Sequence, residues 1–165
     1  MKKNQKGFSL IELLIVVVIM GIIAAIATPN LLASRRAANE SSAIGSLRTI
    51  TSAEITYQST SETGDFAAQD VLAAVHLVDD ILGCSTTPCA KSGYVITITP
   101  LPKTATLPAR FDVSAVPQIF GAIGATGTRS FYVNESGVIY ATASGVAPSA
   151  DAATRIVTPD TPLNY

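Results

Sequence analysis

The chain has 165 residues and a formal net charge of −1, a length that suits one modest domain plus an appendage. The near-neutral charge gives no basic patch, so it does not argue for nucleic acid as a partner. Charged residues make up only 14% of the chain, which favours an exported domain over a cytosolic enzyme.

An apolar run dominates the N-terminus. Residues Phe8 to Ala27 hold a single charge, Glu12, and as a helix they span about 30 Å, enough to cross a bilayer core. Their large apolar side chains favour insertion by roughly 6 kcal/mol, against about 3 kcal/mol lost to one carboxylate. Insertion is therefore favoured, and Glu12 needs a partner. Three lysines precede the run, at positions 2, 3 and 6, and predict a cytoplasmic N-terminus.

A secretory signal peptide and a plain signal anchor are the ordinary alternatives for such a segment. A signal peptide has an apolar core of about 7–15 residues before a small-residue cleavage site, and this run is longer. Neither alternative needs Gly7 at the boundary or an acid at Glu12.

The segment "KGFSLIELLIVVVIMGIIAAIATPN" resembles the N-terminus of the type IV pilin and type II secretion pseudopilin superfamily. The resemblance rests on a basic leader, Gly7 followed by Phe8, an acid at Glu12 and a later Pro29. It implies that a prepilin peptidase cleaves between Gly7 and Phe8 and methylates the new Phe8 amine. It also implies an inner-membrane single-pass precursor whose mature form enters an extracellular pilus or a periplasmic pseudopilus.

The position of Glu12 has a physical explanation under this resemblance. Cleavage creates a cationic amine on Phe8, and in a filament Glu12 of one subunit pairs with that amine on a neighbour. Each charge is costly alone in hydrocarbon and tolerable as a pair. We expect Glu12 and Phe8 to set the axial register of assembly.

The resemblance implies a structural subunit of a type IV pilus, serving adhesion, twitching motility or DNA uptake. A pseudopilin of a type II secretion system is the alternative, and a membrane-anchored binding domain that never polymerises is a lesser one. The implied partners are other copies of the chain, the prepilin peptidase, the membrane, and an inner-membrane assembly platform with its assembly ATPase.

Proline and glycine mark the end of the apolar run. Pro29 removes a backbone N–H and its ring clashes with the preceding turn, while Gly21 is a second weak point. One interpretation is a helix stop in which Thr28 caps a new helix. The interpretation that the resemblance favours is a continuous helix kinked at Gly21 and Pro29.

The next segment, from Leu31 to Ser59, predicts an amphipathic helix. Its apolar stripe recurs every three or four residues and indicates a face packed under a sheet. The stripe consists of Ile44, Leu47, Ile50, Ala53 and Tyr57. Arg35 and Arg36 fall just outside the membrane boundary, where lipid headgroups or acidic neighbours are suitable partners, and Arg48 is expected on a solvated face.

The stretch "SETGD" ends this helix, and residues 66–82 have the spacing of a second one that stops at Gly83. His76 is expected at the surface or in a half-buried slot. Cys84 and Cys89 follow; outside the cytoplasm a disulfide is the default, and we predict a bridge that staples the loop between helix and sheet. With one histidine in the chain, a zinc tetrad is not indicated.

Four short strands are predicted after the cysteines. Residues 94–99 and 110–116 alternate, and residues 129–143 predict a hairpin with its turn at 134–137. The stretch "GAIGATGT" is expected to be a flexible loop and lacks the spacing of a phosphate-binding loop. The Ala-, Pro- and Thr-rich tail is expected to be extended or wrapped over the sheet.

These elements predict an α+β fold in which a long N-terminal helix packs on a small antiparallel sheet. The expected divisions are a cleaved leader (1–7), a transmembrane and assembly helix (8–28), an amphipathic continuation (29–60) and an extracytoplasmic domain (61–165). No catalytic constellation is evident, so we expect a non-enzymatic protein without cofactor or metal.

Overall fold

The computed structural model describes residues 7–84, 89–159 and 161–163. The predicted leader lysines at positions 2, 3 and 6 lie outside the described residues. The chain divides into two units between Arg35 and Arg36. Among the described residues, the only element of the first unit is helix. The second unit, called the body below, holds the sheet.

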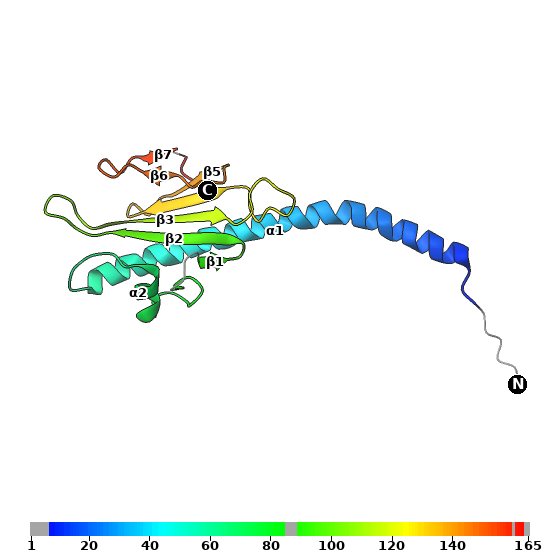
Figure 1. The fold of residues 1–165 in the computed structure, drawn as a ribbon, viewed down its shortest axis with the longest axis horizontal. Helices are drawn as coiled ribbons and strands as arrows, with labels where there is room; N and C mark the ends of the chain where they lie inside the picture. The colour runs from blue at the N-terminus through cyan, green and yellow to red at the C-terminus, as the bar shows by residue number, and fades with distance from the viewer. Residues whose placement is uncertain (1–6, 85–88, 160, 164–165) are drawn as a thin grey trace, which may run out of the picture. The chain divides into compact units, whose positions relative to one another are not determined.

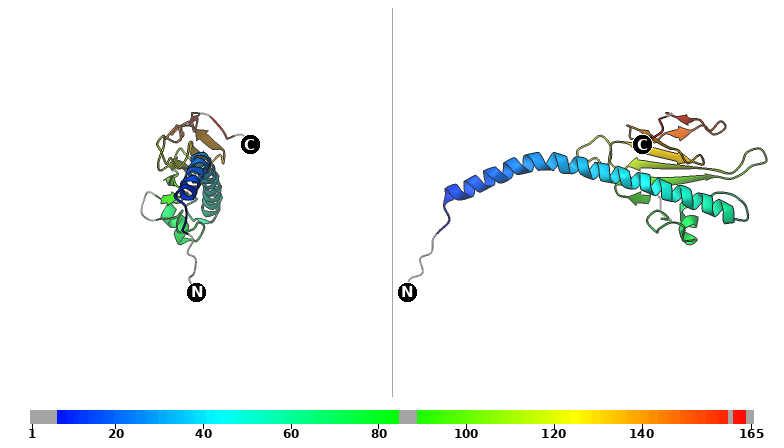
Figure 2. Two further views of the ribbon diagram at one scale, coloured as in Figure 1. Left: turned by 90° about the vertical axis from the view of Figure 1, so that its right-hand side faces the viewer. Right: turned by 180° about the vertical axis from the view of Figure 1, so that it is seen from behind.

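One helix, α1, runs from Leu10 to Thr60 and ends where "SETGD" was expected to end it (Figure 1). Its part within the body presents the predicted stripe to the core. Leu47, Ile50 and Ala53 are buried, and Ile44 and Tyr57 are partly buried against them. The stripe prediction is therefore confirmed, and the view from behind shows α1 running along one face of the sheet within the body (Figure 2).

The sheet has five antiparallel strands in sequence order, so that each strand pairs with the next along the chain. The strands are β1 (Cys89–Lys91), β2 (Tyr94–Leu101), β3 (Arg110–Pro117), β4 (Ser130–Asn134) and β5 (Ile139–Thr142). The four predicted strands are confirmed, and so is the turn between β4 and β5, where the Gly137 N–H donates to the Asn134 carbonyl over 2.9 Å. The three-residue β1 was missed, because it is too short to show alternation.

The core lies between this sheet and α1. Inward-facing residues of β2 and β3 alternate with half-exposed ones, as a sheet covered on one face requires. Two pairs of aromatic rings pack in this core. The ring centroids of Phe66 and Phe111 lie 4.7 Å apart, and those of Tyr94 and Phe131 lie 5.9 Å apart. The α+β prediction is confirmed.

The second predicted helix is much shorter than expected, and the prediction of helix over residues 66–82 was wrong. Helix α2 spans only Gln69–Ala74. It ends in a Schellman motif, with His76 in the left-handed region (φ 58°) and the Leu77 N–H bonded to the Leu72 carbonyl. The chain then folds back and places Gly83 against Ala73, where an added Cβ would lie 2.2 Å from the Ala73 Cβ. A continuous helix cannot bring these two residues together.

The disulfide and the tail complete the body. Cys84 and Cys89 are bridged, with Cα atoms 5.7 Å apart, as predicted. The tail adds a hairpin of β6 (Ser149–Ala150) and β7 (Val157–Thr158). Beyond it the Leu163 N–H donates to the Ile139 carbonyl on β5, so the tail does wrap over the sheet edge.

Candidate assembly site

The start of α1 is built around Ser9 and Glu12. Ser9 precedes the first helical residue, and a Glu12 carboxylate oxygen accepts a hydrogen bond from the Ser9 backbone N–H over 2.9 Å. A serine or threonine followed three residues later by glutamate or glutamine is the capping-box pattern, in which the acid satisfies one of the unpaired N–H groups of a helix start. The sequence contains this signal, "SLIE", which was missed because Glu12 was interpreted only as a charge in an apolar run.

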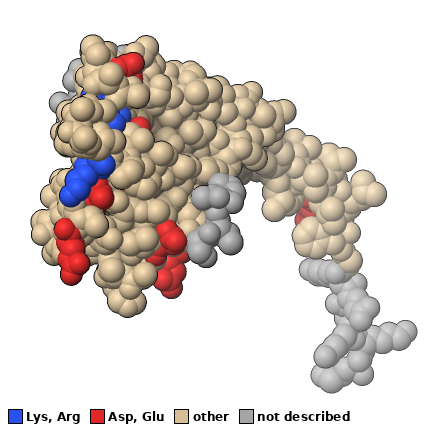
Figure 3. All heavy atoms as spheres, turned by 60° about the vertical axis from the view of Figure 1, so that its left-hand side comes forward, with Lys and Arg blue, Asp and Glu red and all other residues tan. Residues whose placement is uncertain are grey.

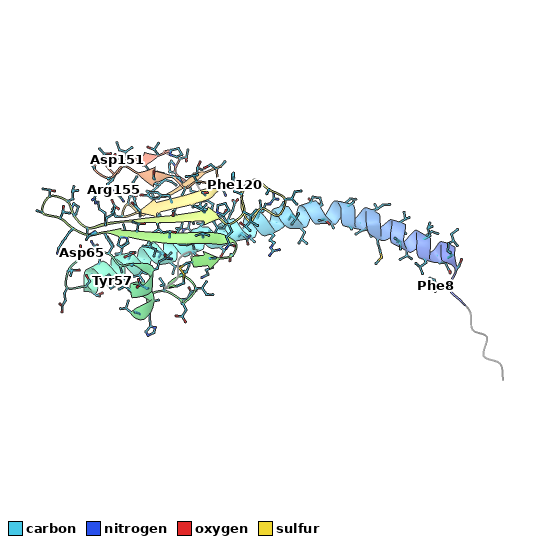
Figure 4. The ribbon with its side chains drawn as sticks, viewed as in Figure 1. Phe8, Tyr57, Asp65, Phe120, Asp151 and Arg155 are labelled. Carbon is cyan, nitrogen blue, oxygen red and sulfur yellow. A yellow bond between two sulfur atoms is a disulfide. The ribbon has the colours of Figure 1, made fainter. Side chains whose placement is uncertain are left out.

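Gly7 and Phe8 lie just before the helix, and Phe8 exposes 79% of its surface (Figure 4). The apolar residues that follow are exposed in the same way; Leu14, Val17 and Ile23 each expose more than half of theirs. Figure 3 shows this helical stretch as an almost uncharged surface with one acidic spot. An apolar surface of this extent indicates a lipid or protein partner.

This helix passes the length and hydropathy requirements for crossing a membrane. Within Leu10–Thr60, one window reaches a mean hydropathy of 3.0 and none of it is buried inside the protein. A helix of this kind near an N-terminus is by itself weak evidence, because signal sequences share the property. Combined with the residues that begin it, the helix fits a membrane-anchored precursor.

The helix continues without interruption through Gly21 and Pro29. The interpretation of Thr28 as the cap of a new helix was therefore wrong. Thr28 instead donates its hydroxyl to the Ala24 carbonyl over 2.7 Å, and the Asn30 side chain donates to the Ile26 carbonyl over 3.3 Å. These side-chain bonds lie on either side of Pro29, which cannot donate a backbone hydrogen bond. The kink at Gly21 and Pro29 stays a prediction.

The first turns of α1 within the body hold the loop between β3 and β4. The Arg36 Nε donates to the Ala125 carbonyl over 3.1 Å, and the Asn39 amide donates to the Thr126 carbonyl over 2.8 Å. Glu40 accepts from the Thr128 N–H over 2.8 Å and its hydroxyl over 2.6 Å. The loop expected to be flexible is therefore fixed to one face of α1.

Arg129 adds an ion pair to this contact, with its Nη2 2.9 Å from Glu40. Burial raises the pKa of Glu40, but the hydrogen bonds from Thr128 and the charge of Arg129 prevail and hold it below its ordinary value. Glu40 and the second buried acid, Glu54, were not predicted from the sequence. The signal was present, since both occur at three- and four-residue steps on the apolar stripe, where charged residues are rarely buried without a purpose.

The remaining predicted residues lie apart from this contact. Arg48 and His76 are exposed at the surface of the body, as expected. The Cys84–Cys89 bridge lies beside β1, at the far side of the sheet from β5. Among the described residues no group of three or more His, Cys, Asp or Glu is arranged to hold a metal ion.

Comparison with known proteins identifies the N-terminal segment. Residues 2–28 match the prokaryotic N-terminal methylation motif. The chain is 60% identical over 38 residues to the type IV wide pilus major component PilA4 of Thermus thermophilus, covering 23% of this chain and 29% of that protein. The resemblance to pilins and pseudopilins is thereby confirmed over the motif region.

Two secretion proteins match over stretches of similar length. Type II secretion system core protein G of Dickeya chrysanthemi is 34% identical over 47 residues, covering 28% of this chain and 31% of that protein. The same-named protein of Aeromonas hydrophila is 37% identical over 46 residues, covering 28% and 32%. The chain thus spans less than a third of the length of the relatives it matches. No solved structure matches it significantly.

Proposed function

We propose that the chain is a structural subunit of a bacterial type IV pilus, which polymerises through its N-terminal helix. One observation carries the proposal: the exposed apolar residues 8–27 lie within the match to the methylation motif and contain a single acid, Glu12. The relatives are named as a pilus component and as secretion-system proteins rather than as enzymes, which supports a structural role over a catalytic one.

Maturation follows from the same segment. We infer that a prepilin peptidase removes residues 1–7 by cutting between Gly7 and Phe8, then methylates the Phe8 amine. Residues 8–28 anchor the precursor in the inner membrane with the N-terminus in the cytoplasm, residues 29–60 continue the helix, and residues 61–165 lie outside the cytoplasm. An assembly platform with its ATPase then moves the subunit from the membrane into the filament.

Glu12 has two competing partners in this scheme. In the single chain it accepts from the Ser9 N–H; in the filament it pairs with the Phe8 amine of a neighbour. The pair gains more than the cap because both of its members are charged and both are removed from water. The Gly21–Pro29 stretch gives the packed helices a place to bend, since Pro29 leaves one backbone bond unmade.

A pseudopilin of a type II secretion system is the second candidate, and the two matches to core protein G favour it. The two functions share the motif and the helix. They differ in where the polymer is found: filaments sheared from the cell surface indicate a pilus, and their absence with loss of secretion in a deletion strain indicates a pseudopilus.

The test compares Glu12→Ala with Glu12→Gln. Glutamine keeps the capping-box bond to Ser9 and removes the charge, whereas alanine removes both. We expect both variants to be processed to a methylated Phe8 and to stay in the membrane fraction, and both to lose filaments. Normal filaments from Glu12→Gln would mean that Glu12 acts only as a helix cap and that assembly does not need its charge. A chain that keeps residues 1–7 in cells with the peptidase, or that never polymerises, would support a non-polymerising anchored domain.

A further inference from the structure

The loop between β3 and β4 exposes apolar side chains although it is firmly attached. Ile119 and Phe120 expose 46% and 42% of their surface, and Ile123 exposes all of its own. From Val113 to Thr128 the sequence has no charged residue. Figure 4 places Phe120 at the opposite end of the body from Asp65.

This apolar loop, residues 118–128, is held in one conformation by its own backbone and by α1. The Thr126 N–H donates to the Ile119 carbonyl over 3.0 Å, and the Ala125 N–H donates to the Ala122 carbonyl over 3.0 Å. Gly127 passes so close to Tyr94 that an added Cβ would lie 2.0 Å from the tyrosine hydroxyl. A loop this constrained does not expose isoleucine and phenylalanine for lack of order.

The attachment also gives the loop a direction. Ala125 is bound by Arg36, Thr126 by Asn39 and Thr128 by Glu40, so the contacts advance along α1 in chain order. Ile123 lies in the turn that the Ala125–Ala122 and Thr126–Ile119 bonds close, next in the chain to the contact with Arg36, the first residue of the body. Arg36 also lines a depression together with Phe120 and Ala125.

Under the proposed anchorage, the body begins in the chain at Arg36, directly after the membrane-spanning stretch. The proposed anchor at 8–28 continues without a charge as far as residue 34. We place Glu12 of the unassembled subunit at the cytoplasmic headgroups, so that residues 13–34, about 33 Å as a helix, cross the bilayer core at a small tilt. Arg35 and Arg36 then fall at the headgroups, where lipid phosphates attract guanidinium groups. Among the described residues no acid pairs with either arginine.

We propose that the apolar loop inserts into the outer interface of the bilayer and, with Arg36, holds the body of the unassembled subunit against the membrane. Isoleucine and phenylalanine beside basic side chains are the composition of segments that lie in the interfacial plane. If the apolar loop of a second copy covered this surface instead, Arg35 and Arg36 would meet no acid there, because residues 113–128 carry no charge. The inference rests on the membrane anchorage in the proposed function.

The test uses the full-length chain in vesicles of phosphatidylcholine and phosphatidylglycerol, labelled at single introduced cysteines with an environment-sensitive fluorophore. The Cys84–Cys89 bridge leaves the native sulfurs unreactive. Ile123→Cys reports the loop, Val17→Cys reports the anchor, and Val138→Cys, which is 41% exposed beyond the other end of β4, is the matched control. Lipids brominated near the headgroup or near the chain end act as quenchers.

We expect the label at Ile123 to be blue-shifted and quenched most by the shallow bromines, the label at Val17 by the deep ones, and the label at Val138 by neither. Quenching at Val17 without quenching at Ile123 overturns the loop proposal and leaves the anchor intact. A blue shift at Ile123 that appears only at high protein-to-lipid ratio, without quenching, identifies a second copy as the occupant and also overturns it. Loss of quenching at Val17 refutes the anchorage itself.

Discussion

Glu54 makes the stability of the body depend on pH. Its side chain is fully buried on the face of α1 that packs under the sheet. One carboxylate oxygen accepts from the Ala67 N–H over 2.9 Å, and the other is buried without a hydrogen-bond partner among the described residues. Burial raises the pKa of Glu54 from 4.5 to about 7, although the Ala67 bond acts in the opposite direction.

The sign and size of the effect follow from this shift. A folded-state pKa above the unfolded one means that the folded body binds the proton more tightly. The stabilisation is therefore complete below about pH 4.5, falls as the pH rises towards 7, and is gone above it. At 1.36 kcal/mol per pKa unit, Glu54 accounts for about 3 kcal/mol of the free energy of unfolding over this interval.

Glu54→Gln removes the titration while an amide oxygen remains to accept from Ala67. We expect the free energy of unfolding of the wild type to fall by about 3 kcal/mol more than that of the variant between pH 5 and 8. Glu62→Gln is the matched control, since it removes an exposed acid near the end of the same helix. The acids whose pKa is lowered act at lower pH and with the opposite sign, so they do not mimic the effect.

The assay is urea unfolding of the full-length chain in nonionic detergent, followed by tyrosine fluorescence, because the chain has no tryptophan. Tyr57 lies one turn from Glu54 and packs on the core, which makes it a local reporter. A difference between wild type and Glu54→Gln that stays constant across this pH range would refute the reasoning, and so would an equal slope change in Glu62→Gln.

Two further predictions concern the body and use the same assay. Replacing Cys84 and Cys89 with serine opens a six-residue loop and should lower the free energy of unfolding by about 2 kcal/mol; an unchanged urea midpoint would contradict a stabilising role for the bridge. Gly127→Ala should cost about 1–3 kcal/mol because its Cβ meets the Tyr94 hydroxyl, and Tyr94→Phe should recover part of that loss in the double variant. Gly45→Ala is the control, since an added Cβ there meets nothing within 4 Å and a helix gains from alanine, so an equal loss at both glycines would rule out the contact.

Local pattern was enough to predict most of the fold. The stripe on α1 and the alternation in β2 and β3 are periodic signals, and they located the core residues correctly. The prediction of α2 was wrong because the helix ends where His76 adopts a left-handed conformation. No glycine or proline marks that position in the sequence. The later apolar residues kept helical spacing, but they reach the core by folding back rather than by continuing.

In the candidate site too, contacts between residues close in the chain could be predicted and contacts between distant residues could not. The capping box of Ser9 and Glu12 is a contact between residues three apart, so the sequence contains it in full. The contacts that fix the apolar loop join residues 87 to 89 positions apart, and no spacing rule reaches that far. The buried acids Glu40 and Glu54 were missed for a different reason: the stripe was identified by its apolar members alone, although both acids occur at helical spacing on the same face.

A comparison of Glu12 with Glu40 supports the proposal that Glu12 takes a partner from another copy of the chain. A carboxylate has about four acceptor sites. Glu40 uses them on the Thr128 N–H, the Thr128 hydroxyl and the Arg129 guanidinium, all from its own body. Glu12 accepts one hydrogen bond, from Ser9, and nothing else among the described residues fills its remaining capacity. Water can do so in solution, but not in an apolar environment, where an under-bonded carboxylate is costly. In the proposed filament, a cationic amine on another copy supplies both the missing donors and the opposite charge, which would account for an acid at the start of an otherwise apolar helix.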